Sequence, residues 1–579
     1  MAESIDLNRV SFIVMREMRS PIIALILVYA ISILVMVSIP GPVIEGKTHN
    51  MSIFHALYFM TYTATTTGFG EIPYEFNNAQ RFWAMACLYV SVITWFYAIG
   101  SIVRLFQNPF FVRALEERQF TKAVKRISGP FFIVCGFGDT GSLLTRGLSD
   151  HGFPAVIIDD NEERIKALKL RDYRVAMSGF CADASVPKHL LEAGVQHPNC
   201  KAVVAITNCE ETNLKIAALA RLLNPGIGII AMSKVEVFEE TLATLGGEVH
   251  VVDPFKTFAK VLGAALKHPE YTGLSQWLAK EPGATLNKFC APPMGHWIIC
   301  GYGRMGHEVN RVLTLHGIDT TVIDPHEATG SESPAQYIVG RTTAKTLVKA
   351  RVDQAVGILA GTDDDGHNLG ILLNARNLNP GLFSLVRQNR HENRLAFAAA
   401  NIDLIMQPTM VTSRRILFLL IAPLLKPFFA YLVADEPDRQ QELMAVIQRL
   451  NDKIGVRQPH LQTIFINENS SHAALKYLAD GNSLRLGHLI RHPDDLTKQL
   501  PIVVLIIKSG DTLIPLPSDD YQLKSGDQLL LCGTQSAVRL LNATLNNEYT
   551  LAFVQSGQIL PRGYVMQWFA RRQIFTIQN

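Results

Sequence analysis

Two long runs of uncharged, mostly apolar residues lie near the start of the chain. Residues 22–39 are almost all apolar, and residues 82–103 carry no charge between Arg81 and Arg104. Because about 20 apolar residues in a helix cross a bilayer, both runs predict membrane-spanning helices. Basic residues concentrate before the first run and after the second. This bias predicts a multi-pass membrane protein with cytoplasmic N- and C-termini.

A third apolar stretch, within residues 51–73, is too short to cross the membrane and runs into Thr-Thr-Thr-Gly-Phe-Gly-Glu. This order predicts a re-entrant pore helix followed by irregular backbone, which membranes tolerate only where it is buried in protein or lines a water-filled path. The glycines can turn successive carbonyl groups toward one axis, so that four copies replace the hydration shell of a cation. We expect the Thr66 hydroxyl at the inner end and the Glu71 negative charge at the outer mouth. The residues predicted to line the path are Thr66, Thr67, Gly68, Phe69, Gly70 and Glu71.

The sequence TTGFGE between two spans resembles the selectivity filter of potassium channels, whose usual form is Thr-Val-Gly-Tyr-Gly-Asp. Thr67, Phe69 and Glu71 replace the Val, Tyr and Asp of that form. The resemblance implies a homotetrameric pore for K⁺, and the departures leave a less selective cation channel as an alternative. Gly100, late in the second span, is either a gating hinge, as in related channels, or a small packing residue.

After Arg104 the pattern becomes that of an α/β protein. Residues 131–160 predict a buried strand, a Gly-rich turn, a helix and a second strand that ends in an acidic residue. The spacing of the glycines and the acid is the dinucleotide fingerprint, in which the backbone approaches a pyrophosphate at a helix N-terminus and the acid binds ribose hydroxyls. The nucleotide-binding residues predicted here are Gly136, Phe137, Gly138, Asp139, Thr140, Gly141, Asp159 and Asp160.

The same pattern returns in residues 296–325, where each fingerprint residue lies 165 positions after its counterpart. A second shared pattern begins at Asn213 and at Asn368, so two copies of one α/β domain are predicted. The copies resemble RCK domains of the TrkA-N type, the regulators of potassium conductance. In the order of its parts the chain is closest to prokaryotic two-transmembrane potassium channels with tandem RCK domains, of the GsuK type. The resemblance implies nucleotide gating, a cytoplasmic octameric RCK ring and a bacterial inner (plasma) membrane location.

The two copies differ where a ligand would bind. The acids of both copies would repel a 2′-phosphate, which favours NAD, ADP or AMP over NADP. Arg304 lies beside the pyrophosphate position of the second copy, whereas Asp139 occupies it in the first. The family's adenine-side Asp-Ala pair is Asp183-Ala184 in the first copy, and Arg341 lies there in the second. The residues predicted for the second copy are Gly301, Tyr302, Gly303, Arg304, Met305, Gly306, Asp324 and Arg341. The alternative for each copy is a nucleotide-free scaffold.

Three later segments complete the copies. Residues 253–269 predict an amphipathic helix. Residues 413–433 are apolar, but Pro423 and Pro427 interrupt them, which favours a buried crossover or dimer-interface helix over a third span. The short alternating strands of residues 503–533 resemble the small C-terminal lobe of RCK proteins.

The expected fold is an α-helical pore with two spans and a re-entrant pore helix, fused to two tandem α/β Rossmann-like RCK domains and a small α+β C-terminal lobe. The predicted parts are a cytoplasmic N-terminus (1–20), a pore domain (21–104), a linker to the gating ring (105–130), the first Rossmann lobe (131–252), a crossover helix and link (253–295), the second lobe (296–410), crossover or interface helices (411–455), the C-terminal lobe (456–545) and a tail (546–579).

Composition removes several function classes. The chain has 54 basic and 51 acidic residues and a net charge of +3, so no global basic field indicates nucleic acid. Its eight cysteines show no CxxC spacing, which disfavours a zinc site or a disulfide framework. There is no room between the copies for the substrate domain of an oxidoreductase, so we do not expect an enzyme. Carboxylate groups at 159–160, 162–163, 210–211 and 363–365 make Ca²⁺ a second candidate ligand, with its ligating residues unknown.

These observations predict a ligand-gated potassium channel that needs the lipid bilayer, three further copies of the chain and small nucleotide ligands. Two alternatives stay open. One is a less selective cation channel with a scaffold ring, and the other is a regulatory subunit of potassium transport.

Overall fold

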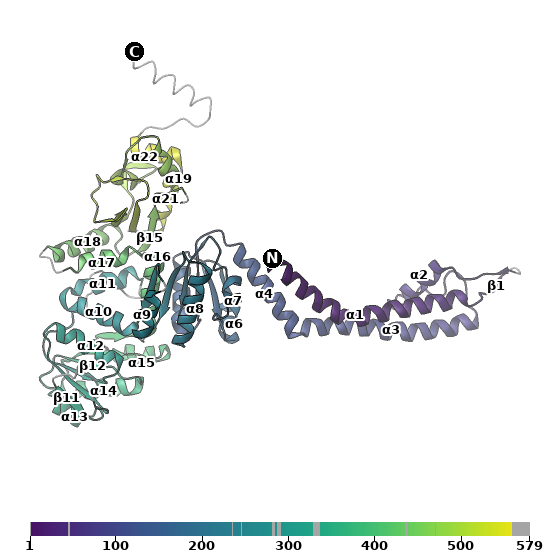
Figure 1. Cartoon of the computed structure of the whole chain (residues 1–579), viewed down its shortest axis with the longest axis horizontal. Helices are drawn as coiled ribbons and strands as arrows, with labels where there is room; N and C mark the ends of the chain where they lie inside the picture. The colour runs from purple at the N-terminus through teal and green to yellow at the C-terminus, as the bar shows by residue number, and fades with distance from the viewer. Residues whose placement is uncertain are drawn as a thin grey trace, which may run out of the picture. The chain divides into compact units, whose positions relative to one another are not determined.

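The computed structural model describes residues 2–44, 47–233, 236–244, 246–280, 284–286, 291–327, 336–434, 438–468 and 470–557. The chain divides into two compact units, Met1–Arg126 and Ile127–Asn579 (Figure 1).

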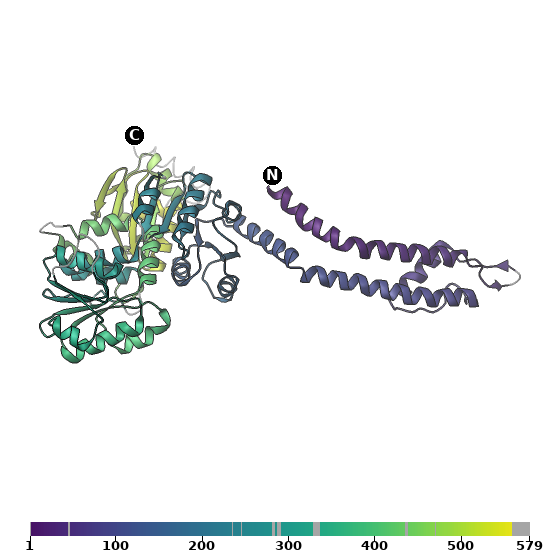
Figure 2. The same cartoon turned by 60° about the horizontal axis from the view of Figure 1, so that its bottom comes forward.

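The first unit is built on two long helices that lie side by side (Figures 1 and 2). Both are long and apolar enough to cross a membrane over Phe12–Ser38 and Asn78–Gln107, as predicted from their apolar runs. A capping box fixes the start of the second helix, because the side chains of Asn77 and Gln80 each accept from the other's backbone N–H. The Trp83 Nε1–H donates to the Ser32 carbonyl at 3.2 Å and ties the helices together. The elements of this unit are α1 (Ala2–Ser38), β1 (Val43–Ile44), β2 (Lys47–Thr48), α2 (Ile53–Ala64), α3 (Asn78–Gln107) and α4 (Pro109–Lys125).

The second unit contains two six-stranded parallel sheets with the same strand order. The first runs β5 (Met177–Cys181), β4 (Ala155–Asp159), β3 (Phe131–Cys135), β6 (Cys200–Ala205), β7 (Gly228–Met232) and β8 (Val249–Val252). The second runs β11 (Gln336–Val339), β10 (Thr320–Asp324), β9 (Trp297–Cys300), β12 (Gly357–Ala360), β13 (Phe383–Arg387) and β14 (Leu404–Met406). In each sheet the strand that comes first in the chain lies in the middle. The next two strands are added on one side of it and the last three on the other, which is the doubly wound order of dinucleotide-binding folds. The predicted duplication and fold class are thereby confirmed.

Helices connect these strands. In the first copy they are α5 (Asp139–Asp150), α6 (Glu162–Leu170), α7 (Pro187–Glu192), α8 (Glu210–Leu223) and α9 (Glu236–Thr244). In the second copy they are α12 (Arg304–Leu315), α13 (Ala344–Lys349), α14 (Asp365–Leu378), a 3₁₀ turn η1 (His391–Asn393) and α15 (Arg394–Ala399).

The helix that follows each sheet packs on the other copy. The helix α10 (Pro254–Lys267) follows the first sheet but packs on α12, where a Cβ on Gly263 would lie 3.1 Å from Val312. The helix α16 (Pro408–Ile421) follows the second sheet but packs on α5, where a Cβ on Gly147 would lie 2.9 Å from Leu417. Glycine at both contacts lets the helix axes approach closely. The two copies therefore share one continuous packing arrangement through exchanged helices.

The second exchanged helix continues into α17 (Leu425–Leu432) after a bend of 110° at a break that contains Pro423. Its apolar residues, including Ile416 and Phe428, belong to a buried core shared with the first copy. The apolar residues of 413–433 thus pack inside the second unit, whereas Pro423, Lys426 and Ala430 are exposed. The helices α11 (Pro269–Leu278) and α18 (Arg439–Lys453) pack against each other beside this segment.

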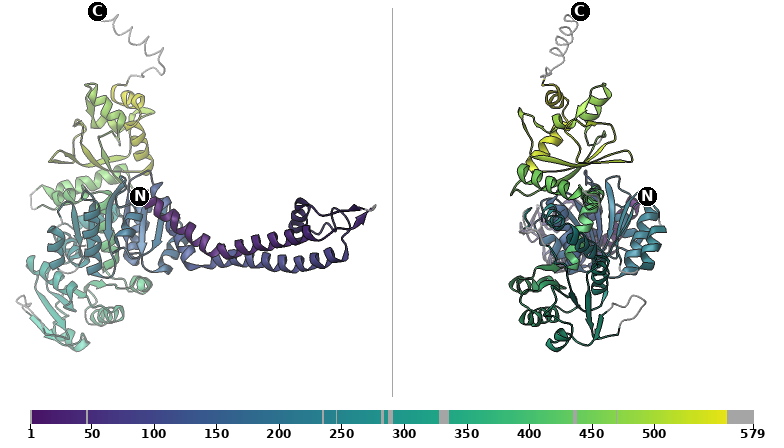
Figure 3. Two further views of the ribbon diagram at one scale, coloured as in Figure 1. Left: turned by 45° about the vertical axis from the view of Figure 1, so that its right-hand side comes forward. Right: turned by 90° about the vertical axis from the view of Figure 1, so that its left-hand side faces the viewer.

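A small lobe follows, drawn in yellow-green in Figure 3, around an antiparallel sheet of order β15 (His460–Phe465), β22 (Gln528–Gly533), β19 (Ile502–Ser509) and β20 (Thr512–Pro515). Its other elements are α19 (His472–Ala479), β16 (Leu484–Arg485), α20 (Leu486–Leu489), β17 (Arg491–His492), β18 (Asp495–Gln499), β21 (Gln522–Leu523), α21 (Gln535–Leu545) and α22 (Glu548–Ser556).

The helix α22 lies in the segment predicted as a tail, and the structure corrects that boundary. Leu551 and Val554 are fully buried, and Glu548 forms an ion pair with Lys476 at 2.8 Å. The lobe therefore extends to Ser556. Residues 558–579 of the predicted tail lie outside the described residues.

Candidate functional site

The pore loop leaves α2 with an alternating backbone conformation. Thr66, Gly68 and Gly70 have φ values of +59°, +66° and +89°, while the residues between them have negative φ. A regular strand would point successive carbonyls to opposite sides, whereas this alternation turns them to the same side. Thr66 is β-branched, so its left-handed conformation is a strained one of the kind that clusters at functional sites.

The carbonyl oxygens of residues 66–69 accept no hydrogen bond from any part of the chain that the structure describes. Residues 65–70 are exposed in the single chain, so these carbonyl groups are open to a ligand. Oxygens that face one side and have no partner are therefore suited to bind a cation.

Tyr62, in the last turn of α2, holds the loop at two points. Its carbonyl accepts from the backbone N–H of Thr67 at 2.9 Å, and its hydroxyl donates to the Gly70 carbonyl at 2.6 Å. The Phe69 ring meets the Tyr62 ring edge to face at 5.6 Å and stacks on Tyr58 at 6.4 Å. The loop is thus fixed by contacts within one chain, and the Gly70 carbonyl is turned to Tyr62.

Glu71, which we expected to place negative charge at the outer mouth, is paired with a cation. Its carboxylate accepts from Nε and Nη2 of Arg81 at 2.8 and 3.0 Å, and from the Phe76 N–H at 2.7 Å. Two parallel bonds from one guanidinium group are the strong form of an ion pair. The Arg81 cation therefore offsets the Glu71 charge.

Gly100 lies inside the unbroken helix α3. A Cβ built on it meets no atom within 4 Å. It makes no close packing contact within the described chain, and its role as a hinge stays a prediction.

The Gly-rich turns of the two α/β copies have the same shape. Gly136 has a φ of +108°, and a Cβ on Gly141 would lie 2.0 Å from the Gly136 carbonyl oxygen. The first and third glycines are thus required by the turn and by helix packing. A Cβ on the second glycine, Gly138 or Gly303, would meet nothing within 4 Å. This open position at a helix N-terminus is where the fingerprint places a pyrophosphate.

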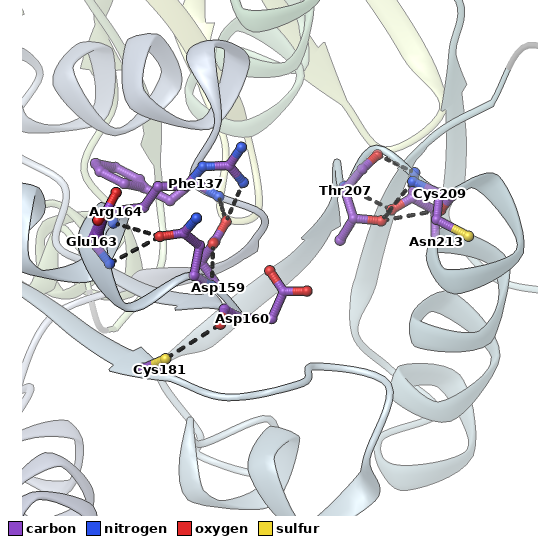
Figure 4. A network of polar contacts seen from close by, with 10 residues as sticks. Phe137, Asp159, Asp160, Glu163, Arg164, Cys181, Thr207, Cys209 and Asn213 are labelled. Atoms are coloured by element: carbon purple, nitrogen blue, oxygen red, sulfur yellow. Dashed lines mark hydrogen bonds and ion pairs between the residues drawn. The ribbon is translucent and has the colours of Figure 1, made fainter.

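The acidic residue of each fingerprint holds the turn in place (Figure 4). Asp159 is 5% exposed, and its carboxylate accepts a hydrogen bond from the Phe137 N–H at 2.5 Å. The same carboxylate accepts from Nη1 of Arg164 at 3.4 Å. In the second copy Asp324 accepts from the Tyr302 N–H at 2.7 Å. Both predicted ribose-binding acids therefore have a structural role. The second oxygen of each is used as well, because Asp159 accepts from the Asn161 N–H and Asp324 from the His326 N–H, both at 2.9 Å.

Two arginines near the Gly-rich turn of the first copy were not among the residues predicted from the sequence. Arg164 reaches Asp159, and Arg171 lies over the Phe137 ring at 5.6 Å and donates to the Ser142 hydroxyl in the first turn of α5. Arg171 thus brings a cation to the turn that also carries Asp139. The only sequence signal for a role of Arg171 at this turn was its positive charge. Arg171 lies 29 residues from its partner Ser142 along the chain, so the contact between them could not be read from local spacing.

A polar network at the end of the next strand is repeated in both copies. The Asn213 Oδ1 accepts from the Thr207 N–H at 2.8 Å, and the Asn368 Oδ1 accepts from the Thr362 N–H at 2.9 Å. Thr207 and Asn213 lie beside the fingerprint turn in Figure 4. The repeat offset of the two asparagines was the sequence signal for this network.

In the second copy the predicted phosphate cation contacts the first copy's helix. The Arg304 guanidinium lies over the ring of Phe255 on α10 at 5.1 Å, and Arg387 lies over the same ring at 5.1 Å. Among the other predicted residues, Ala184 and Met305 are buried, Thr140 is half-buried, and Asp139, Asp160, Asp183 and Arg341 are exposed. The Asp183 carboxylate accepts from the Ser185 N–H at 2.8 Å.

The described residues contain no group of three or more His, Cys, Asp or Glu side chains that could hold a metal ion. The carboxylate of Asp365, in one of the acidic runs, is taken up by the N–H groups of Asn389 and Arg390 at 2.6 and 3.0 Å. The acidic runs therefore do not converge on a visible calcium site.

Comparison with known proteins matches each part of this architecture. The family described as "Ion channel" matches residues 22–108, and the TrkA-N domain matches residues 132–254 and 297–408. Together these matches take in more than half of the chain.

Two curated relatives from Methanocaldococcus jannaschii, "Probable potassium channel protein 2" and "Potassium channel protein 1", are 26% and 25% identical over 42% of this chain. The chain spans 65% of the length of each of them. The solved structures named "GsuK channel bound to NAD" and "GsuK Channel" cover 93% and 94% of this chain and 99% of their own, with 17% and 16% identity and TM-scores of 0.48 and 0.49. With a matched ion-channel region followed by two matched TrkA-N domains, the chain belongs to the ion channels that carry tandem TrkA-N domains.

Proposed function

We propose that four copies of this chain form a K⁺-selective pore that is gated by nucleotides bound to its α/β copies. The observation that carries the pore is the row of unpartnered carbonyl oxygens at residues 66–69, held by Tyr62 in an alternating backbone. Four such rows around one axis would supply the dipoles that replace the water around K⁺. Pairing of Glu71 with Arg81 leaves this selection to the carbonyl groups rather than to a ring of free charges.

Gating follows from the way the chain is connected. The pore-lining candidate α3 ends at Gln107, α4 runs to Lys125, and the first strand of the α/β copies begins at Phe131. A linker of a few residues transmits a displacement with little slack. The exchanged helices make the two copies one packed body, so a ligand in either turn would act on the same linker.

The Gly-rich turns favour a phosphate-bearing nucleotide: NAD or ADP, which have a pyrophosphate, or AMP, which has a single phosphate. The open position at Gly138 and the nearby Arg171 support an anionic ligand in the first copy. Arg304 supports one in the second. We expect eight such copies, two from each chain, to form a cytoplasmic ring in which Ca²⁺ is a further regulator, and both termini to be cytoplasmic in a bacterial plasma membrane.

Single-channel recording from the full-length protein in planar bilayers tests this proposal. We expect K⁺ currents with little Na⁺ permeability and an open probability that changes when NAD, ADP or Ca²⁺ is added to one face only. Because a ligand gates only through different affinities for the open and closed states, binding alone would not suffice. Equal Na⁺ and K⁺ permeability would support the less selective channel, and indifference to every ligand would reduce the ring to a scaffold.

A further inference from the structure

A pocket of about 970 Å³ lies between the exchanged helices and the edge of the second sheet. Its walls come from α10, α11, α16 and α17, and from the second copy around β14 and α15. Neither Gly-rich turn, residues 136–141 or 301–306, contributes a lining residue among those described. The pocket is thus separate from the nucleotide sites, and its volume suits a ligand of nucleotide size.

Positive charge dominates the lining of this pocket. Its only carboxylate within the described residues is Asp253, which is 8% exposed and accepts from the Phe255 N–H at 2.7 Å at the start of α10. That carboxylate is occupied as a helix cap and offsets little of the charge. The basic residues that line the pocket are Lys256, Lys260, Arg394, Arg414, Arg415 and Lys426.

Several of these cations have no partner in the described part of the chain. Lys260, Arg415 and Lys426 make no hydrogen bond or ion pair there. Arg415 is half-buried, and burial lowers the pKa of its guanidinium group. Holding a partly buried cation without a counter-charge is costly, and an anionic ligand would remove that cost.

The cations come from equivalent places in the two copies. The helices α10 and α16 pack against each other, and each begins with a proline, Pro254 or Pro408. Lys260 and Arg414 follow these prolines at the same distance along the two helices. A pair of cations in equivalent positions suits a ligand with negative charge at two ends.

We propose that this pocket binds a small organic anion that carries at least two phosphate groups. Guanidinium groups donate paired hydrogen bonds that match phosphate oxygens, and the lysines add point charges. Tyr271 and Phe429, with ring centres 4.9 Å apart, supply an apolar wall for the organic part. The inference does not depend on potassium conduction or on nucleotide binding at the Gly-rich turns.

Titration calorimetry of the full-length protein in detergent, with fructose 1,6-bisphosphate as the probe, tests this pocket. The double variant Lys260→Gln/Arg415→Gln should weaken binding at least tenfold. Arg449→Gln, an exposed arginine of α18 outside the pocket, should leave it unchanged, and thermal unfolding checks that both variants are folded. Citrate, which has three carboxylates and no phosphate, should bind at least tenfold more weakly.

Lysine acetylation of the unaltered protein gives a second measurement. The bisphosphate should protect Lys260 and Lys426 but not the exposed Lys498. The proposal would be overturned if the bisphosphate neither binds nor protects these lysines. That result is expected if a second copy of the chain covers the pocket. Equal affinity of the double variant would place the probe elsewhere, and equal affinity for citrate would refute the phosphate class.

Discussion

The guanidinium group of Arg304 lies 5.1 Å from the ring centre of Phe255, although the two residues belong to different copies of the repeat. The guanidinium carbon lies over the Phe255 ring, and the Arg304 side chain makes no hydrogen bond within the described residues, so its N–H groups are available to a phosphate. Such a contact stabilises a cation by about 0.5–1 kcal/mol at an exposed site. Phe255 thus orients the cation that we expect to contact a nucleotide in the second copy.

Replacing Phe255 with leucine should therefore weaken ADP binding to the second copy by about two- to fivefold. This fold-change corresponds to the free energy of the lost contact. Arg304→Gln should weaken it by about tenfold or more, because a charge-assisted bond to the ligand is lost. Titration calorimetry of the full-length protein measures both. Phe465→Leu, in the small C-terminal lobe, is the control. Unchanged affinity in Phe255→Leu would mean that the ring does not orient Arg304.

Tyr62→Phe should destabilise the conducting state of the pore loop. The variant removes the hydroxyl that bonds to the Gly70 carbonyl at 2.6 Å but keeps the ring contact with Phe69. A neutral hydrogen bond contributes about 0.5–1.5 kcal/mol, and a tetramer would lose four. We expect shorter openings and a lower ratio of K⁺ to Na⁺ permeability in single-channel records. Tyr58→Phe is the matched control, because the Tyr58 hydroxyl has no hydrogen bond within the described residues; an equal effect of both changes would argue against the role of the Gly70 bond.

The pair formed by Glu71 and Arg81 predicts opposite effects of removing either partner. Arg81→Gln leaves an unpaired carboxylate near the mouth and should raise the unitary K⁺ conductance in dilute salt. Glu71→Gln leaves an unpaired cation and should lower it. Both effects should fade at about 1 M salt, where charges are screened within about 3 Å.

The double variant Glu71→Gln/Arg81→Gln controls for this charge effect, because it should return the conductance close to that of the unaltered channel. Conductance that falls equally in all three variants would show that the pair matters for folding of the loop and not for the field at the mouth.

A pair of buried histidines predicts loss of stability in acid. His151 and His460 stack with ring centres 6.1 Å apart, and burial, with a smaller contribution from Lys280, lowers their pKa values to about 3 and about 4. The unfolded chain binds these protons near pH 6.5, whereas the folded chain does not until the pH falls to about 4 or below. Stability is therefore fully present above pH 6.5 and declines as the pH falls from there.

Thermal unfolding of the full-length protein between pH 7.5 and 4.5 measures this decline, which amounts to at most about 1.4 kcal/mol per pH unit for each histidine. His460→Phe should make the pH dependence shallower. His472→Phe, at the exposed start of α19, should leave it unchanged. A slope that is the same in both variants would assign the acid sensitivity to other groups.

The sequence allowed prediction of the features that depend on local spacing. Gly136 and Gly141 lie five positions apart along the chain, and the turn they form needs only the strand and helix beside them. Likewise, the uncharged runs of α1 and α3 predict spans because the requirement for a span is length and apolarity. The repeat made the second copy predictable from the first.

Contacts between distant segments could not be predicted in this way. Nothing in the residues around Phe255 indicates that its ring meets Arg304, because the exchange of α10 between copies depends on packing of whole helices. The same holds for Arg171 and Ser142, and for Glu71 and Arg81, where side-chain direction decides the pairing. The helix α22 was not predicted because the sequence does not show that its apolar residues, such as Leu551, pack into the core of the C-terminal lobe.

The exchange of α10 and α16 also bears on the history of the chain. Each copy lends a helix to its neighbour, so deleting either copy would expose an apolar face on the survivor and remove the helix that covered it. Once the duplication and this exchange were in place, a return to a single copy would require simultaneous repair at Gly147 and Gly263, where both borrowed helices fit. The helix exchange therefore favours keeping the two copies together in one gene.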